Sequence, residues 1–246
     1  MIVLSALAGF GVFVAVDGLV TTGDAAATAR DIVASESLFR LGIASLFAVI
    51  ALDVVVAWGL VRVFAHVDAG ISRLAGWLRL AFAAVFMVAI TELTGALRLL
   101  GDGGDLSAFT TDQLHTQAVL RIEAFSSVFD AALVLFGLHL IVAGYLAFRS
   151  AVIPKVLGVL LAVAGVGYLV DSFTAVLGSP TNLGAFTFIG EFLLAVWLVT
   201  RSRKFAEATL ARSQPTSPAL SEPPREPAAR TGARQATVAA RRSATR

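Results

Sequence analysis

The sequence contains no cysteine, and only 15% of its 246 residues are charged. The absence of cysteine excludes a disulfide-bonded secreted domain. A soluble domain averages roughly 45–50% apolar and about 25% charged residues. Here 57% of the residues are hydrophobic, and the mean hydropathy is +0.84. One soluble core cannot bury so much apolar surface, so the composition excludes a soluble globular protein and predicts an integral membrane protein.

Motifs of familiar chemistry are also missing. The chain has no HExxH zinc motif, no GxSxG nucleophile motif, and neither a GxGxxG sequence nor a P-loop. Its three histidines are too few and too scattered for a usual zinc site. Gly101–Asp105 holds two aspartates but lacks the spacing of an EF-hand. The sequence therefore predicts no metal and no cofactor, and no motif favours an enzyme.

Charge is divided unevenly along the chain. Residues 1–204 carry a net charge of −2, whereas residues 205–246 carry +4 and are rich in Pro, Ser, Thr, Ala and Arg. Residues 205–246 have no apolar periodicity, so we expect a disordered cytoplasmic tail, with arginines able to contact anionic lipids of the inner leaflet. No folded segment has a basic face, so nucleic-acid binding is not predicted. The oligomeric state stays open.

Six apolar stretches within residues 1–204 have about the length of a membrane-spanning helix. They are 2–20, 41–61, 80–100, 125–148, 156–177 and 183–200. The predicted fold class is therefore an all-α integral membrane protein with a six-transmembrane-helix bundle. In the fifth stretch, the small residues Gly158, Ala162 and Gly165 share one side, which is typical of close helix packing.

The two long connections on the outer side are each predicted to hold a short helix. Asp24 precedes an alanine-rich run and is typical of a helix N-cap. Thr110 and Gln113 have the spacing of a capping box, which predicts a short helix from Thr111 into Arg121. We expect both helices to lie on the membrane surface or to cover the bundle.

Lysines and arginines near the ends of the stretches predict the orientation. Eight of them flank one side of the membrane, against four on the other, where acidic residues are frequent. The eight are Arg62, Arg73, Arg79, Arg149, Lys155, Arg201, Arg203 and Lys204. Both termini are therefore predicted to be cytoplasmic, in the inner membrane of a bacterium.

Several ordered motifs resemble those of a known family. They are Gly23–Ala29, Ala34–Arg40, Phe136–Leu140, Gly144–Leu146, Ile153–Leu161, Gly167–Asp171, Ile189–Glu191 and Trp197–Leu198. Over residues 1–203 they make the chain similar to the bacterial domain-of-unknown-function 4386 family. The resemblance implies a multi-helix bacterial membrane protein. It implies no activity, substrate or catalytic residue.

Ionisable side chains inside the apolar stretches are the candidate functional residues. A charge at mid-bilayer costs about 2.5–3.5 kcal/mol, so such groups are expected to face the interior of the bundle. Residues retained there at this cost are candidates for a functional role. Counted at about 1.5 Å per residue, most of the acids fall in the outer half of the bilayer. The primary candidates for binding a ligand or proton are Glu92, Arg98, Asp130, Asp171 and Glu191, and the secondary candidates are Asp17, Asp53 and His139.

Three functions from different classes agree with this pattern. The first is binding or movement of a small polar or cationic solute, with proton coupling as an option, through an outward-facing acidic cavity in which Arg98 is the counter-ion. The second is an intramembrane enzyme that uses His139 and a buried carboxylate. The third is a membrane scaffold or regulator, whose acids would be dispersed in separate pairs without a cavity.

Overall fold

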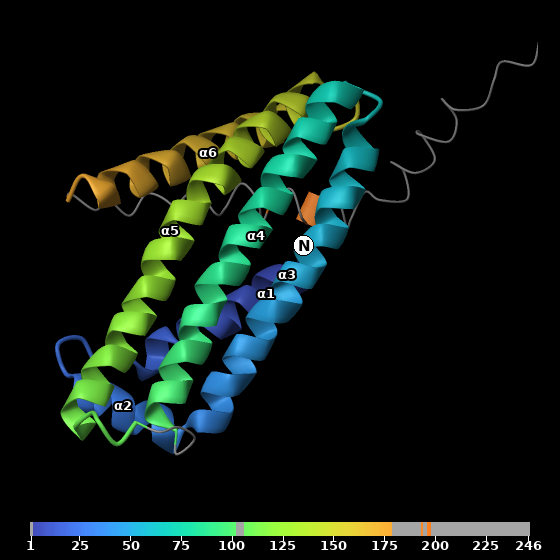
Figure 1. The fold of residues 1–246 in the computed structure, drawn as a ribbon. Coiled ribbons are helices and arrows are strands. Elements are labelled where there is room, and N and C mark those ends of the chain that lie inside the picture. The colour runs from blue at the N-terminus through green and yellow to red at the C-terminus, as the bar shows by residue number, and fades with distance from the viewer. Residues whose placement is uncertain (1, 102–105, 179–192, 194–195, 198–246) are drawn as a thin grey trace, which may run out of the picture. The chain divides into compact units, whose positions relative to one another are not determined.

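The computed structural model describes residues 2–101, 106–178, 193, 196 and 197, and the described chain is all-helical (Figure 1). Its elements are α1 (Ile2–Gly9), a π-helical turn (Phe10–Val14), a 3-10 turn (Asp17–Leu19), α2 (Ala25–Ala34), α3 (Glu36–Phe64), α4 (Ala69–Leu100), α5 (Thr111–Arg149) and α6 (Lys155–Val176). The all-α class is confirmed for these residues. Apart from residues 193, 196 and 197, the predicted stretch 183–200 lies outside the described residues, as does the tail, 205–246.

Four of these helices, α3 to α6, are long and apolar enough to cross a membrane. At about 1.5 Å per residue, even α6 extends about 33 Å, which exceeds a hydrocarbon core of about 30 Å. They contain the second to fifth predicted stretches, so the structure indicates a membrane protein with at least four candidate spans. The predicted count of six is not confirmed.

The first predicted stretch, 2–20, is an apolar helical segment that changes geometry along its length. It begins as α1, passes into the π-helical turn Phe10–Val14, and ends in the 3-10 turn Asp17–Leu19. The segment packs against α3, where the hydroxyl of Ser45 donates to the carbonyl of Leu7 at 3.2 Å. At Val3–Leu19 it is shorter than the four candidate spans.

Local capping chemistry sets the beginnings of three helices. The carboxylate of Asp24 accepts a hydrogen bond from the backbone N–H of Ala27 at 2.8 Å, which confirms the predicted cap of α2. Asp68 caps α4 by accepting from the N–H groups of Gly70 and Ile71, both at 2.9 Å. Each cap satisfies backbone donors that the first helical turn leaves unpaired.

The capping box of Thr110 and Gln113 is also confirmed, but it does not begin a separate short helix. It begins α5, a continuous helix of 39 residues that includes the predicted fourth stretch. The expected second outer helix is therefore the first turns of α5. The helix continues because no proline or glycine interrupts residues 111–136.

The helices α3, α4 and α5 run side by side and alternate in direction, with α4 packed against both others (Figure 1). The turns Ala65–Asp68 and Ser150–Pro154 therefore share one end of the bundle, which we term the 65–68 end. At the opposite end, α2 lies with the first turn of α3, the last turn of α4 and the first turn of α5. We term this the α2 end.

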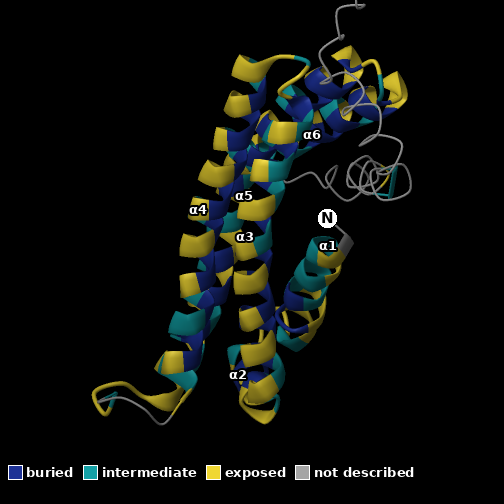
Figure 2. Ribbon diagram, turned by 90° about the vertical axis from the view of Figure 1, so that its right-hand side faces the viewer, coloured by how far each residue is buried: buried dark blue, intermediate teal, exposed yellow. Residues whose placement is uncertain are grey.

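Aromatic packing fills the space between α4 and α5. The rings of Phe82 and Phe136 have centroids 4.7 Å apart, and those of Phe86 and Phe129 are 4.9 Å apart. Buried residues face this interior, whereas exposed residues follow the outward sides of the helices (Figure 2). Many of the exposed residues are large and apolar, as expected of a surface that contacts lipid.

Glycines bring α5 and α6 into close contact. A Cβ atom added to Gly158 would lie 2.6 Å from the backbone nitrogen of Phe148 and 2.7 Å from the carbonyl oxygen of Gly144. Gly165 approaches the carbonyl oxygen of Gly137 in the same way. The predicted small-residue packing face of the fifth stretch is thereby confirmed.

Exposed aromatic residues accompany basic residues at the 65–68 end. The guanidinium of Arg62 lies 4.8 Å from the ring centroid of Trp58, and that of Arg149 lies 5.9 Å from Tyr145. Trp77 on α4 is also exposed. Such aromatic belts occur at membrane–water interfaces, so these residues give a reference level from which depth along each helix can be counted.

Candidate functional site

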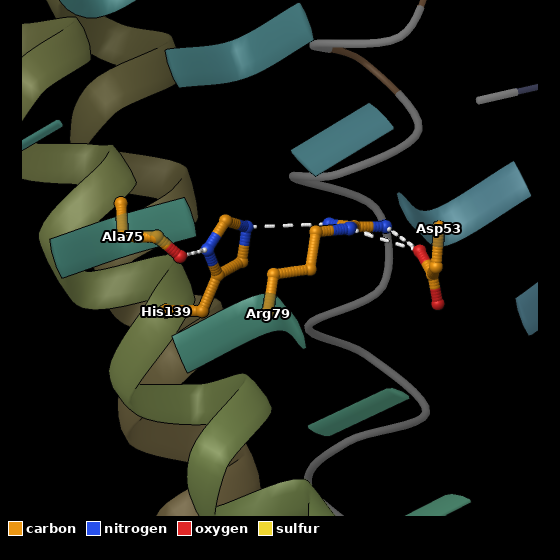
Figure 3. Close-up of polar contacts among 4 residues, drawn as sticks. All are labelled: Asp53, Ala75, Arg79 and His139. Atoms are coloured by element: carbon orange, nitrogen blue, oxygen red, sulfur yellow. Dashed lines mark hydrogen bonds and ion pairs between the residues drawn. The ribbon is translucent and has the colours of Figure 1, made fainter. Parts of the chain in front are cut away.

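Three ionisable residues from three helices meet inside the bundle (Figure 3). Asp53 lies on α3, Arg79 on α4 and His139 on α5, and each side chain is almost completely buried. One oxygen of the Asp53 carboxylate accepts from Nε of Arg79 at 2.9 Å and from its Nη2 at 2.5 Å. The opposite side of the guanidinium faces His139, with Nη1 3.2 Å from Nε2. We call these residues the buried network.

The partners of His139 determine its protonation state. Nδ1 lies 2.8 Å from the carbonyl oxygen of Ala75, which can only accept, so Nδ1 carries the hydrogen. The Arg79 guanidinium can only donate, so Nε2 accepts and carries no hydrogen. His139 is therefore a neutral imidazole. The Arg79 guanidinium also lies over the ring of Phe136, with its Cζ atom 5.2 Å from the ring centroid.

This geometry leaves neither ring nitrogen of His139 free to react. Both ring nitrogens of His139 are occupied, and Asp53, Arg79 and His139 are each no more than 2% exposed. A general base needs access to the proton it removes. The arrangement therefore ties three helices together and does not favour the enzyme hypothesis based on His139.

Sequence reasoning missed Arg79, which it assigned to a cytoplasmic loop as one of the eight orienting charges. The structure corrects this because α4 begins at Ala69, which places Arg79 almost three turns inside the helix. The exposed Trp77 lies two residues before Arg79, and counts along the three helices place the buried network about 3–9 Å below the aromatic belt. Asp68, which precedes a helix-compatible run, was the signal that could have located the true start of α4.

The primary candidate Glu92 lies on α4, towards the α2 end. Its carboxylate pairs with Nη1 of Arg121 on α5 at 2.7 Å. The predicted counter-ion was Arg98, but the residue that contacts Glu92 is Arg121. The pair is partly exposed, with 22% of the Glu92 side chain and 54% of the Arg121 side chain accessible.

The candidates Asp130 and Asp171 lie at a different interface. Asp130 is on α5 and Asp171 on α6, and their like charges interact electrostatically. The hydroxyl of Ser172 donates to the backbone carbonyl of Asp130 at 2.9 Å. Arg121 and Asp130 are about 180° apart around α5. Glu92, which pairs with Arg121, and Asp171, which interacts with Asp130, therefore lie on opposite sides of α5.

The structure thus divides the predicted acidic set. By residue count, Glu92, Asp130 and Asp171 each lie about 22 Å along their helices from Trp77, Tyr145 and Val156 respectively, but they belong to two interfaces. Asp17 is exposed in the 3-10 turn at the end of the first segment. Glu191 lies outside the described residues. In the described ranges, no group of three or more His, Cys, Asp or Glu residues could hold a metal ion.

Two open hollows flank Arg98 at the α2 end. The first lies between α3 and α4, has a volume of about 490 Å³, and is lined by Glu36, Arg40, Phe47 and Arg98 among others. The second has a volume of about 480 Å³ and is lined by Glu92, Thr94, Arg98, Leu106 and Arg121 among others. We call them the α3–α4 hollow and the α4–α5 hollow. Both volumes lie within the range of about 300–1,000 Å³ that small-molecule sites have.

Arg98 is the cation that the two hollows share, and it is exposed. Arg40 pairs with Glu36 at 2.6 Å, and Arg121 pairs with Glu92. Among the described residues, Arg98 has no ion-pair partner. Counted over the described lining residues, each hollow carries one positive charge in excess, since these include two arginines and one glutamate.

Fold and site together describe a helical protein with four candidate membrane spans, a buried ion pair near one end of the bundle and two charged hollows at the other. The family described as "Domain of unknown function (DUF4386)" matches residues 1–202, and the chain belongs to this family, which confirms the resemblance inferred from its motifs. An uncharacterized protein of Archaeoglobus fulgidus is 33% identical over 165 residues, which are 67% of this chain and 86% of that relative. No solved structure matches the chain.

Proposed function

We propose that the protein binds a small polar solute with an anionic group in the α4–α5 hollow. The observation that carries the proposal is the exposed guanidinium of Arg98, which has no ion-pair partner among the described residues and lines a hollow of about 480 Å³. The Glu92–Arg121 pair supplies a further carboxylate and guanidinium at the same hollow. The site therefore offers both donors and an acceptor to a polar ligand.

The charge of the hollow favours an anion over the cation that the acidic residues of the sequence suggested. Glu92 is neutralised by Arg121 at 2.7 Å, so Arg98 provides the excess charge. A guanidinium binds carboxylate and phosphate groups through two parallel hydrogen bonds, which adds geometric specificity. The predicted cationic ligand would instead need an acid without a partner, and Glu92 does not provide one.

Replacing Arg98 with glutamine is expected to weaken anion binding at this hollow. Purified protein in detergent would be titrated with inorganic phosphate and succinate, and with tetramethylammonium as the cation, by isothermal calorimetry. We expect heat from the anions alone, and at least a tenfold weaker affinity in Arg98→Gln, because a charge-assisted hydrogen bond of about 1.5–3 kcal/mol is lost.

Arg73→Gln is the matched control, because Arg73 is an exposed arginine on the same helix at the opposite end. It removes the same charge and should leave the titration unchanged. Binding of tetramethylammonium in preference to both anions would contradict the proposal. So would equal affinities for phosphate in the wild type and Arg98→Gln.

Movement of the solute across the membrane is a second candidate, favoured by the irregular first segment. Helices that break at membrane depth are typical of transporters, and this segment changes from α to π to 3-10 geometry. Uptake of labelled phosphate into proteoliposomes, with and without a pH gradient, would separate transport and proton coupling from binding alone. A scaffold role would leave both binding and uptake absent.

The membrane arrangement that we propose has six spans, with both termini in the cytoplasm of a bacterium. Arg79 is buried, so it no longer counts among the orienting loop charges. The two ends of the described bundle then carry four Lys or Arg each, and the remaining asymmetry comes from Arg201, Arg203 and Lys204. Reporter fusions at the Ala65–Asp68 turn and within 101–105 are expected to lie in opposite compartments, the first in the cytoplasm. Reversed signals would overturn the orientation.

A further inference from the structure

The α3–α4 hollow is a groove with a charged end and an apolar end. On α3 it is lined by Glu36, Arg40, Ile43 and Phe47, which follow one another at helical spacing along one face. The charged residues come first along α3 and the apolar residues follow, about 16 Å from Glu36 to Phe47. On α4, Arg98 lies towards the charged end. A groove of this kind matches an amphiphile better than a wholly polar solute.

The depth of the groove agrees with an interfacial site. Arg40 lies about 27 Å along α3 from the exposed Trp58, and Arg98 about 32 Å along α4 from the exposed Trp77. Both distances match a hydrocarbon thickness of about 30 Å. If the aromatic belt marks one interface, the two arginines therefore lie at the lipid headgroups of the opposite leaflet. Ile43 and Phe47 then lie at the depth of the acyl chains.

The charge at this level selects among lipids. Glu36 pairs with Arg40 at 2.6 Å, and Arg98 adds one positive charge beside the pair. This single excess positive charge complements the phosphate of a lipid whose headgroup carries no cation of its own. A zwitterionic headgroup carries its own ammonium group, which the excess positive charge would repel.

The geometry points to a binding site for one anionic phospholipid in the α3–α4 hollow, with the phosphate at Arg40 and Arg98 and an acyl chain along Ile43, Ala44 and Phe47. This site adjoins the proposed solute site and shares Arg98 with it. The residue Arg40 belongs to the lipid site alone, and Arg121 belongs to the solute site alone. Variants of these two arginines therefore distinguish the two proposals.

Native mass spectrometry of the purified full chain tests the lipid site. The protein in detergent would be mixed with phosphatidylglycerol or phosphatidylcholine of matched acyl chains, and the fraction with one bound lipid would be measured. We expect preferential binding of phosphatidylglycerol, reduced about fivefold in Arg40→Gln because one interfacial arginine is lost. Arg30→Gln is the matched control, since Arg30 is exposed on α2 and does not line the hollow.

A second variant tests the apolar end of the groove. Ala44→Phe fills the space beside Phe47 without a change of charge, and it should reduce phosphatidylglycerol binding while leaving the thermal unfolding of the protein unchanged. Inorganic phosphate added in excess should weaken lipid binding without abolishing it, because phosphate competes for Arg98 alone, whereas Arg40 and the apolar end of the groove still hold the lipid. Equal binding of both lipids, no effect of Arg40→Gln, or an unaffected Ala44→Phe would each overturn the inference. Full displacement by phosphate would show a site for free anions instead.

Discussion

Asp53→Asn is expected to destabilise the folded bundle by about 3–5 kcal/mol, because it leaves the buried guanidinium of Arg79 without its carboxylate. Asp53 and Arg79 are each 2% exposed, so water cannot replace the lost partner. The substitution keeps the shape of the side chain, and any loss of stability therefore reports the charge. The free energy of unfolding would be measured by SDS titration in mixed micelles.

Glu36→Gln is the control, since it breaks an ion pair of similar length on the surface. The Glu36–Arg40 pair is exposed and joins adjacent turns of one helix, so its loss should cost only about 0.3–0.5 kcal/mol. A double variant, Asp53→Asn with Arg79→Met, should be less destabilised than Asp53→Asn alone, because no unpaired charge remains in the core. Equal stabilities of Asp53→Asn and the wild type would mean that Arg79 is hydrated, contrary to its burial.

The sequence was sufficient for those features that short-range chemistry determines. The caps at Asp24 and Thr110 were predicted correctly because a capping side chain acts on backbone groups three residues away. The close packing of α6 was predicted from Gly158 and Gly165 for the same reason, since their spacing alone brings them onto one face. The apolar content of α3 to α6 likewise follows from local composition.

The buried network could not be predicted in the same way. The third predicted stretch begins at Leu80, and Arg79 directly before it is counted with the loop charges. Its charge is compensated by Asp53 and His139, which lie far away in the sequence and arrive only when three helices pack. Sequence-based depth counting could not identify the arginine that connects His139 to Asp53.

The acidic candidates illustrate the limit of counting along a helix. Rise per residue gives only the distance of Glu92, Asp130 and Asp171 along their own helices. A shared site also requires that the side chains face one another, which depends on how each helix is rotated about its axis. Tertiary packing sets that rotation, and it pairs Glu92 with Arg121 while Asp130 interacts with Asp171.

Gly158→Ala is expected to separate α5 from α6, although it adds one methyl group only. The added Cβ would meet the backbone nitrogen of Phe148 at 2.6 Å and the carbonyl oxygen of Gly144 at 2.7 Å. Backbone atoms cannot move aside as a flexible side chain can, so the helices must part. Overpacking of this kind costs about 1–3 kcal/mol, and the loss should appear in the SDS titration and as a lower thermal unfolding midpoint.

The matched control is Gly59→Ala on α3, because a Cβ added to Gly59 meets no atom within 4 Å. Alanine is the better helix former by about 0.5–1 kcal/mol, so this variant should be slightly more stable than the wild type. The same substitution therefore has opposite signs at the two positions, which a general preference for alanine in helices cannot produce. Because the chain has no cysteine, cross-linking gives a direct check. A disulfide between Phe148→Cys on α5 and Lys155→Cys at the start of α6 should form less readily when Gly158→Ala is also present. Unchanged cross-linking together with unchanged stability would show that the two helices do not pack through these glycines.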